Sequence, residues 1–118
     1  MTNLINAVTV SIGRNVGTVP MSALLWESYK IATRNIMNLA LQRPVDFVVD
    51  GQGGEWEGTP EESAILTTLA GDDGFNADQV NGLRQMLKWL LRDYHQDAVA
   101  VHVGNSALVT APVLEAVA

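Results

Sequence analysis

The chain contains no cysteine, so disulfides, thiolate nucleophiles and cysteine zinc sites are excluded. Positive charge is also scarce, because seven Lys and Arg residues stand against thirteen Asp and Glu residues, for a formal net charge of −6. A protein of this sign is repelled by phosphate backbones, which argues against general nucleic-acid binding. Apolar runs are short and the N-terminal residues lack the pattern of a signal peptide, so we expect a cytoplasmic protein without a membrane span.

The residues that are present suit one globular domain: there are 118 of them, of which 47% are hydrophobic and 17% are charged. A disordered chain would have fewer apolar residues, and separate cofactor and substrate domains would need a longer chain. We expect a single α+β domain over residues 1–104. The small and apolar residues 105–118 are predicted to form a C-terminal extension that contributes to oligomerisation.

Two kinds of periodicity divide the chain. Alternation of apolar and polar residues predicts strands, and apolar residues at three- and four-residue steps predict helices. Strands are expected over residues 4–12, 45–50, 63–70 and 98–103, helices over 23–42 and about 76–94, a loop over 13–20 and a hairpin arm over 55–57. For residues 63–70 a helix remains the alternative, because Pro60, Glu61 and Glu62 suit a first helical turn.

Both predicted helices carry boundary signals. Ser22 is a natural N-cap for the first helix, and Pro44 is expected to end it. Asn76 and Gln79 have the spacing of a capping box at the start of the second helix. The residues expected to be buried are Leu25, Tyr29, Ala32, Ile36 and Leu39 or Ala40 in the first helix, and Val80, Leu83, Leu87, Leu90 and Tyr94 in the second.

The order β-α-β-β-α-β is that of the ferredoxin-like, split βαβ fold, a four-stranded antiparallel sheet with two helices on one face. The helices are expected to cover the first strand through Val8, Val10 and Ile12, and the second through Phe47 and Val49. The other face would stay open, with Ala7, Thr9, Ser11, Val48, Ala98, Ala100 and His102. This open face and the apolar extension predict a subunit interface, and hence a homodimer or a higher oligomer.

The loop between the first strand and the first helix is the first candidate binding site. Arg14 lies between Gly13 and Asn15, and Gly17 follows in the same loop. Backbone N–H groups where such a loop enters a helix favour anions, and a guanidinium grips phosphate or carboxylate with two parallel bonds. The spacing matches neither a Walker loop nor a dinucleotide fingerprint. The alternative is a structural arginine that pairs with one of the acids.

Tryptophans supply the second candidate feature. Trp56 lies between Glu55 and Glu57 in a glycine-rich arm, where it would stack on a planar ligand or anchor an interface. The alternative for Trp56 is that it folds back over the sheet edge. Trp26 and Trp89 lie on the predicted helices and are expected to pack, with Trp26 nearer to the Arg14 loop. The predicted ligand-binding set is Gly13, Arg14, Asn15, Gly17, Trp26 and Trp56.

Acidic residues are frequent over residues 46–78, and no basic residue occurs between Arg43 and Arg84. This acidic segment is either a docking surface for a protein partner or a solvated face that maintains solubility. It lacks the spacing of an EF-hand loop, so no calcium site or other metal site is predicted.

The sequence shows no evident catalytic set. His95 follows a helix and suits the negative end of its dipole. His102 would share a strand face with Ser11 or Thr9, but Asp50 belongs to the far edge strand, and no nucleophile elbow is present. We therefore expect a protein that is not an enzyme and has no cofactor. A small hydrolase or isomerase centred on His102 is the alternative.

Three stretches carry a family resemblance: residues 8–15, Pro20-Met21-Ser22 with Trp26, and residues 53–58. They resemble small proteins of unknown function from actinobacteria and their phages, in which a strand ending in Gly-Arg precedes a helix with an early tryptophan. The resemblance implies a compact β-α-β-β-α-β domain encoded by a phage. Such proteins often serve as accessory or counter-defence factors.

Taken with the candidate residues, this resemblance leads to a functional hypothesis. We expect a non-enzymatic, homo-oligomeric protein that binds a small anionic ligand such as a nucleotide, or a host protein. The alternative is a protein-interaction or virion component that uses the acidic segment.

Overall fold

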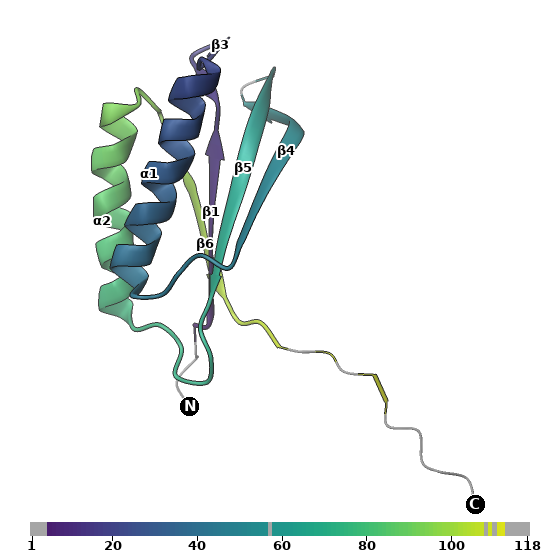
Figure 1. Cartoon of the computed structure of the whole chain (residues 1–118), viewed down its shortest axis with the longest axis vertical. Coiled ribbons are helices and arrows are strands. Elements are labelled where there is room, and N and C mark those ends of the chain that lie inside the picture. Colours follow the sequence, from purple (N-terminus) through teal and green to yellow (C-terminus); the bar gives the residue numbers. More distant parts are fainter. Residues whose placement is uncertain (1–4, 57, 108, 110, 113–118) are drawn as a thin grey trace, which may run out of the picture.

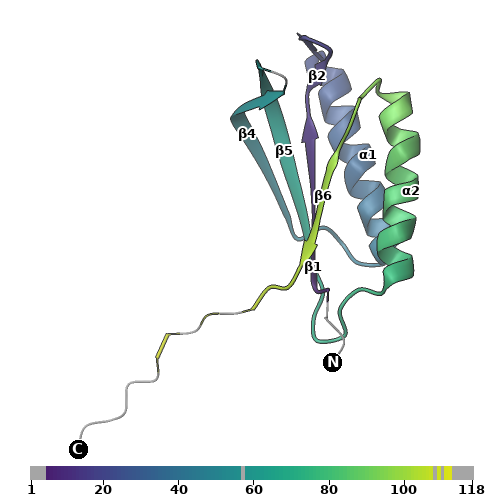
Figure 2. The ribbon, with the colours of Figure 1, turned by 180° about the vertical axis from the view of Figure 1, so that it is seen from behind.

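The computed structural model describes residues 5–56, 58–107, 109, 111 and 112, without the side chains of Gln52 and Trp56. The sheet orders its strands β4-β5-β1-β6, and every neighbouring pair is antiparallel. Both helices lie on the same face of this sheet (Figure 1 and Figure 2). The predicted α+β, ferredoxin-like fold is therefore confirmed. The elements are β1 (Ala7–Gly13), β2 (Asn15–Val16), β3 (Val19–Pro20), α1 (Ala23–Leu41), β4 (Phe47–Trp56), β5 (Thr59–Leu69), α2 (Ala77–Asp93) and β6 (Ala100–Gly104).

The helix boundaries follow from their capping residues. Ser22 Oγ accepts a hydrogen bond from the backbone N–H of Leu25 at 3.2 Å, which satisfies one free donor of the first turn of α1. Asn76 and Gln79 form the predicted capping box at the start of α2. α1 ends at Leu41, and its C-cap residue Gln42, two residues before Pro44, has a left-handed φ of 56°. Neither helix of the described ranges is long and apolar enough to cross a membrane.

The buried side of α1 agrees only in part with the predicted one, because Tyr29 is buried and Ala32, Ile36 and Ala40 pack against the core as expected. Trp26, Tyr29, Thr33, Met37 and Leu41 are buried, whereas Leu25 and Leu39 are 43% and 69% exposed. The prediction was wrong for Leu25 and Leu39 because α1 carries apolar residues on its outer face as well, so apolarity alone does not select the side that faces the sheet. α2 has a cleaner pattern, and the predicted burial of Val80, Leu83, Leu87 and Leu90 is confirmed. The packing predicted for Trp89 is wrong, because this side chain is 61% exposed beside the Arg92 guanidinium.

The residues of β4 that face the helices are also not the predicted ones. Val48 pairs with the buried Leu66, so Val48 lies on the helix side, and Phe47 and Val49 lie on the open face. The reason is that β4 begins only at Phe47, so the buried Val45 is not part of its alternation. Phe47 and Val49 are 55% and 56% exposed.

Two segments predicted as irregular or ambiguous are extended. Residues 13–20, predicted as a loop, contain the small hairpin β2–β3, which turns at Gly17 with a φ of 62°. β5 confirms the strand prediction for residues 63–70 and begins earlier, at Thr59. β4 continues past its glycines through an irregularity between Gly51 and Gly54, so the β4–β5 hairpin is a long arm at the sheet edge.

An aromatic cluster fixes the end of the helix pair that lies nearest to the β2–β3 hairpin. Tyr29 stacks on Tyr94 with ring centroids 4.7 Å apart, and Trp26 meets Tyr29 edge-on at 6.1 Å. Tyr94 Oη and Ser28 Oγ are 2.6 Å apart. Burial raises the pKa of the Tyr29 hydroxyl, and the nearby Glu61 and Tyr94 raise it further. The cluster therefore fixes Tyr94, from which the chain leads towards β6.

The described residues of the C-terminal extension, 105–107, 109, 111 and 112, run away from the domain (Figure 1). The start of the extension is attached to the domain at Ser106. Asn6 Oδ1 accepts a hydrogen bond from the Ser106 N–H, and Asn6 Nδ2 donates one to the Ser106 carbonyl. Further along, Val109 is 97% exposed. Residues 108, 110 and 113–118 of the predicted oligomerisation segment lie outside the described residues.

Candidate functional site

A cleft of about 450 Å³ lies at one end of the open sheet face. Three regions that are distant in sequence form it: the end of β1 with the β2–β3 hairpin that follows it, the β4–β5 hairpin, and the connection from α2 to β6. Ser11 and Gly13 point to this face, because the residues that alternate with them, Val10 and Ile12, are buried under the helices. Its other polar and ionisable lining residues are Asn15, Thr18, Glu55, Thr59, Glu61, Ser63, His95, Gln96 and Asp97.

The charges around the cleft are of one sign. Glu55, Glu61 and Asp97 contribute carboxylates, and His95 is the one nitrogen base among the lining residues. No lysine or arginine of the described chain lines the cleft. An acidic recess with low-dielectric walls attracts cations and repels phosphates. The cleft therefore suits a small ligand that carries positive charge.

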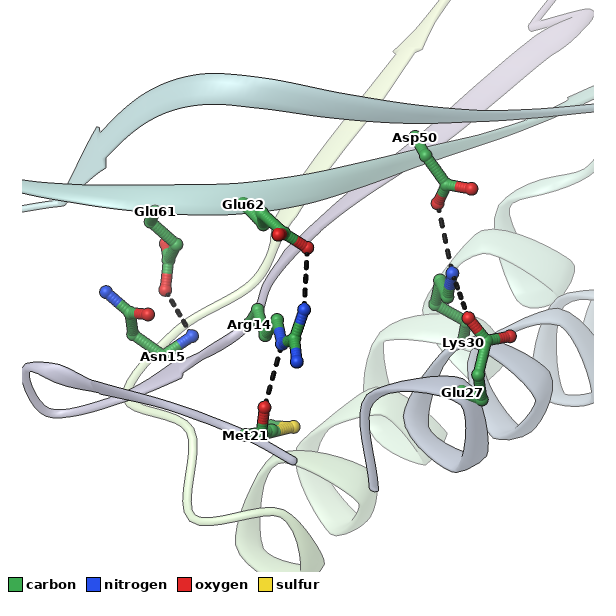
Figure 3. Close-up of polar contacts among 8 residues, drawn as sticks. All are labelled: Arg14, Asn15, Met21, Glu27, Lys30, Asp50, Glu61 and Glu62. Atoms are coloured by element: carbon green, nitrogen blue, oxygen red, sulfur yellow. Dashed lines mark hydrogen bonds and ion pairs between the residues drawn. The ribbon is translucent and has the colours of Figure 1, made fainter. Parts of the chain in front are cut away.

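Glu61 is the most firmly placed of these carboxylates. Its Oε2 accepts a hydrogen bond from the backbone N–H of Asn15 at 2.8 Å (Figure 3). Asn15 is itself buried, with an exposed fraction of 8%. From the sequence, Glu61 was only one member of the acidic segment. Its place beside Gly13 becomes visible only when β1 and β5 are aligned, with Gly13 opposite Ser63 and Glu61 two residues away on the same side of β5.

Arg14 does not line the cleft. Its Nη1 pairs with Glu62 Oε2 at 2.9 Å, and its Nε donates to the Met21 carbonyl at 2.8 Å (Figure 3). This is the structural pairing that the sequence left as the alternative. Of the predicted ligand-binding set, the structure brings Gly13, Asn15 and Gly17 to the cleft.

The pairing of Arg14 leads to a prediction about stability. Arg14→Ala is expected to lower the free energy of unfolding by about 1–2 kcal/mol, because Glu62 and the Met21 carbonyl each lose a donor. The loss stays moderate because Glu62 is 40% exposed and remains solvated. Urea denaturation measures it, with Arg34→Ala, an exposed residue of α1, as the control. An Arg14→Ala variant as stable as the wild type would contradict the structural role.

Of the two predicted tryptophans, Trp26 lies away from the cleft. Trp26 is 4% exposed, and the Lys30 Nζ lies 5.4 Å from its ring centroid. It packs in the core and does not line the cleft. Trp56 ends β4, where its backbone pairs with Thr59. Its side chain lies outside the described residues, so its role in stacking stays a prediction.

The histidines do not form a hydrolytic triad. His102 is exposed on β6, opposite Thr9 on the open face, and does not line the cleft. Asp50 lies on the helix side, where it pairs with Lys30 at 3.2 Å. The Ser-His-Asp arrangement considered for His102 therefore lacks Asp50 on its face. His95, for which a helix-end role was expected, lies in the cleft with a left-handed φ of 54°.

Part of the acidic segment is used inside the fold. Asp46 Oδ2 accepts from the Leu69 N–H at 2.7 Å, and Asp50, Glu61 and Glu62 have the partners described above. These carboxylates each have a hydrogen-bond or ion-pair partner within the fold. Among the described residues, no group of three or more acidic or histidine side chains is arranged to hold a metal ion.

Comparison with known proteins places the fold. No protein family and no curated protein matches the chain. A phage SAM lyase in its apo state is similar in structure, with a TM-score of 0.62 and 21% identity over 98% of each chain. A phage SAM lyase in complex with S-methyl-5'-thioadenosine has a TM-score of 0.55 and 20% identity over 87% of this chain and 82% of the other. An Arabidopsis thaliana protein follows, with a TM-score of 0.51 and 15% identity over 91% and 99%.

These likenesses show a shared fold. They also correct one expectation, that the chain is not an enzyme, because nearly its whole length follows the fold of a lyase. The expectation failed because it required a recognisable nucleophile, base or metal set. When one part of a substrate reacts with another part of the same molecule, the enzyme needs no nucleophile, base or metal of its own. The absence of these groups from a sequence is therefore weak grounds for excluding catalysis.

Proposed function

We propose that this chain is an enzyme that binds S-adenosylmethionine in the acidic cleft and converts it to S-methyl-5'-thioadenosine. The observation that carries the proposal is the cleft itself, which has three carboxylates and no lysine or arginine among its described lining residues. S-adenosylmethionine carries a fixed positive charge on its sulfonium sulfur. We therefore propose a cationic ligand in place of the small anionic ligand that was expected from the sequence. The similarity to phage SAM lyases supports the same substrate.

The chemistry of this conversion defines what the protein must supply. The bond between the sulfonium sulfur and the γ-carbon of the methionyl arm breaks, and its electron pair remains on sulfur. The carboxylate of the same arm forms a bond to that carbon, so no water or other reactant is consumed. Positive charge on sulfur disappears during the reaction, so a carboxylate beside it stabilises the bound substrate more than the transition state. We therefore assign Glu61 to substrate binding, and the rate enhancement to the folded posture of the methionyl arm.

The biological role proposed for this activity is that of a phage accessory factor. Destruction of S-adenosylmethionine removes the methyl donor of host methyltransferases, including those that mark DNA. The structural likeness to phage SAM lyases supports this role, and the resemblance of residues 8–15 and 53–58 to actinophage proteins stays a prediction. Counter-defence by consumption of a host metabolite needs no recognition of a host protein.

The direct test is turnover by the purified chain. Incubation with S-adenosylmethionine should release S-methyl-5'-thioadenosine, detected by mass spectrometry. S-adenosylhomocysteine is the matched control, because it has the same adenosine and amino-acid ends but a neutral thioether, and it should not be cleaved. A chain that neither binds nor consumes S-adenosylmethionine by calorimetry and mass spectrometry would contradict the proposal.

We also propose that the chain self-associates through the open sheet face. Phe47, Val49 and Ile65 form an exposed apolar group there, with Val49 directly opposite Ile65. Such a group is typical of a contact surface, and a two-fold dimer is its simplest use. Light scattering should report a dimer for the wild type and a monomer for Phe47→Asp. Leu39→Asp, at an exposed position on the outer face of α1, is the control that should remain dimeric. A monomeric wild type would contradict this proposal.

A further inference from the structure

Gly13 ends β1, and its Cα lies against the Glu61 carboxylate. A Cβ atom built on Gly13 would overlap both carboxylate oxygens and the carboxyl carbon of Glu61. The overlapped atoms belong to the end of a flexible side chain, so a methyl group at this position would displace the carboxylate before it displaced the strand. The Glu61 carboxylate can therefore lie in its present position because residue 13 is a glycine.

Asn15 holds the same carboxylate from a second direction. Besides the bond from its N–H to Glu61 Oε2, its Nδ2 donates to the Pro60 carbonyl at 3.1 Å, and its own carbonyl accepts from Gln96 Nε2 at 2.9 Å. One buried residue thus connects β5 to the segment between α2 and β6. In the described part of the chain, Oε2 makes the hydrogen bond of this carboxylate, and Oε1 is the oxygen nearest to Gly13.

We propose that Gly13 and Asn15 are positioning residues that hold the Glu61 carboxylate flat against β1, and that position 13 thereby sets the selectivity for a sulfonium ligand over a neutral thioether. The identity of the ligand rests on the proposed function, whereas the position of Glu61 does not. With glycine at position 13 the space above Ser11 and Ser63 stays open. With a larger residue the carboxylate moves into that space, away from the N–H of Asn15.

The position of Glu61 is tested without any ligand. In Gly13→Ala, the ¹³C carboxyl resonance of Glu61 should shift, because the carboxylate leaves its backbone donor, while the resonance of Asp73 in a distant loop should not. Gly104→Ala is the matched control. Gly104 belongs to β6 and lies on the open sheet face, as Gly13 does, but a Cβ added there meets no atom within 4 Å. An unmoved Glu61 resonance in Gly13→Ala would overturn the inference.

Binding tests the consequence for selectivity. Gly13→Ala should weaken S-adenosylmethionine binding about tenfold and change S-methyl-5'-thioadenosine binding less than about threefold. In a Glu61→Ala background, where the clash is absent, adding Gly13→Ala should cause no further loss. Independent, additive losses would show that Gly13 does not act through Glu61 and would overturn the inference. A wild-type chain that binds neither ligand would instead contradict the proposed function, and the ligand-free resonance of Glu61 would still decide its positioning.

Discussion

Glu61→Gln is expected to weaken S-adenosylmethionine binding about tenfold or more and to leave S-methyl-5'-thioadenosine binding unchanged. The substitution keeps the shape of the side chain and removes its negative charge. Opposite charges about 5 Å apart near a protein surface attract by about 3 kcal/mol, and solvent in an open cleft reduces this to about 1–2 kcal/mol. About 1.4 kcal/mol corresponds to a tenfold change in Kd. S-methyl-5'-thioadenosine is a neutral thioether, so it is not attracted to the Glu61 charge and its binding does not change when that charge is removed.

Calorimetric titration of both ligands measures the effect. Asp73→Asn removes the same charge from an exposed loop outside the cleft, so it controls for the change in net charge and should bind both ligands like the wild type. Equal weakening of both ligands by Glu61→Gln would mean that Glu61 shapes the cleft without recognising the sulfonium. If Glu61→Gln weakened the binding of neither ligand, Glu61 would not take part in binding.

The second large effect is on stability. Tyr29→Ala should lower the free energy of unfolding by about 3–5 kcal/mol, because this side chain is 1% exposed and joins Trp26 to Tyr94. A domain of ordinary stability has only about 5–15 kcal/mol in total, so the variant should be largely unfolded in low urea. The loss would also release Tyr94, which precedes the cleft residues His95, Gln96 and Asp97.

Chemical denaturation followed by circular dichroism measures this change. Tyr29→Phe is the control, because it keeps the ring that stacks on Tyr94 and removes only the hydroxyl, so it should lose far less stability than Tyr29→Ala. If the two variants were equally unstable, the hydroxyl and not the aromatic packing would be the main contribution of Tyr29.

The sequence predicted the topology because local signals agreed with one another. Alternation in β1, the Ser22 cap and the Asn76 capping box each define an element without reference to the rest of the chain. The orientation of α1 and β4 was not predictable in the same way. α1 has apolar residues around its whole circumference, and β4 is an edge strand with Phe47, Val48 and Val49 in succession, so composition did not show which face is buried.

The cleft was only partly predictable because it joins residues that are far apart. Asn15 meets Glu61 across 46 positions and Gln96 across 81. Such contacts depend on strand register and on the path of the α2–β6 segment, which no local pattern reveals. One signal was available: Arg14 follows Val8, Val10 and Ile12 at the same alternation, which places it on the helix side, while Gly13 falls on the open side.

The position of β4 at the edge of the sheet has a consequence for aggregation. An edge strand with exposed Phe47, Val48 and Val49 offers unpaired backbone groups to another chain. The irregularity between Gly51 and Gly54 interrupts the regular ladder along this edge, and Asp46 and Asp50 put negative charge beside the apolar stretch. Both features discourage strand-to-strand polymerisation. The acidic residues near β4 therefore help the protein to tolerate an apolar edge that would otherwise promote fibre formation.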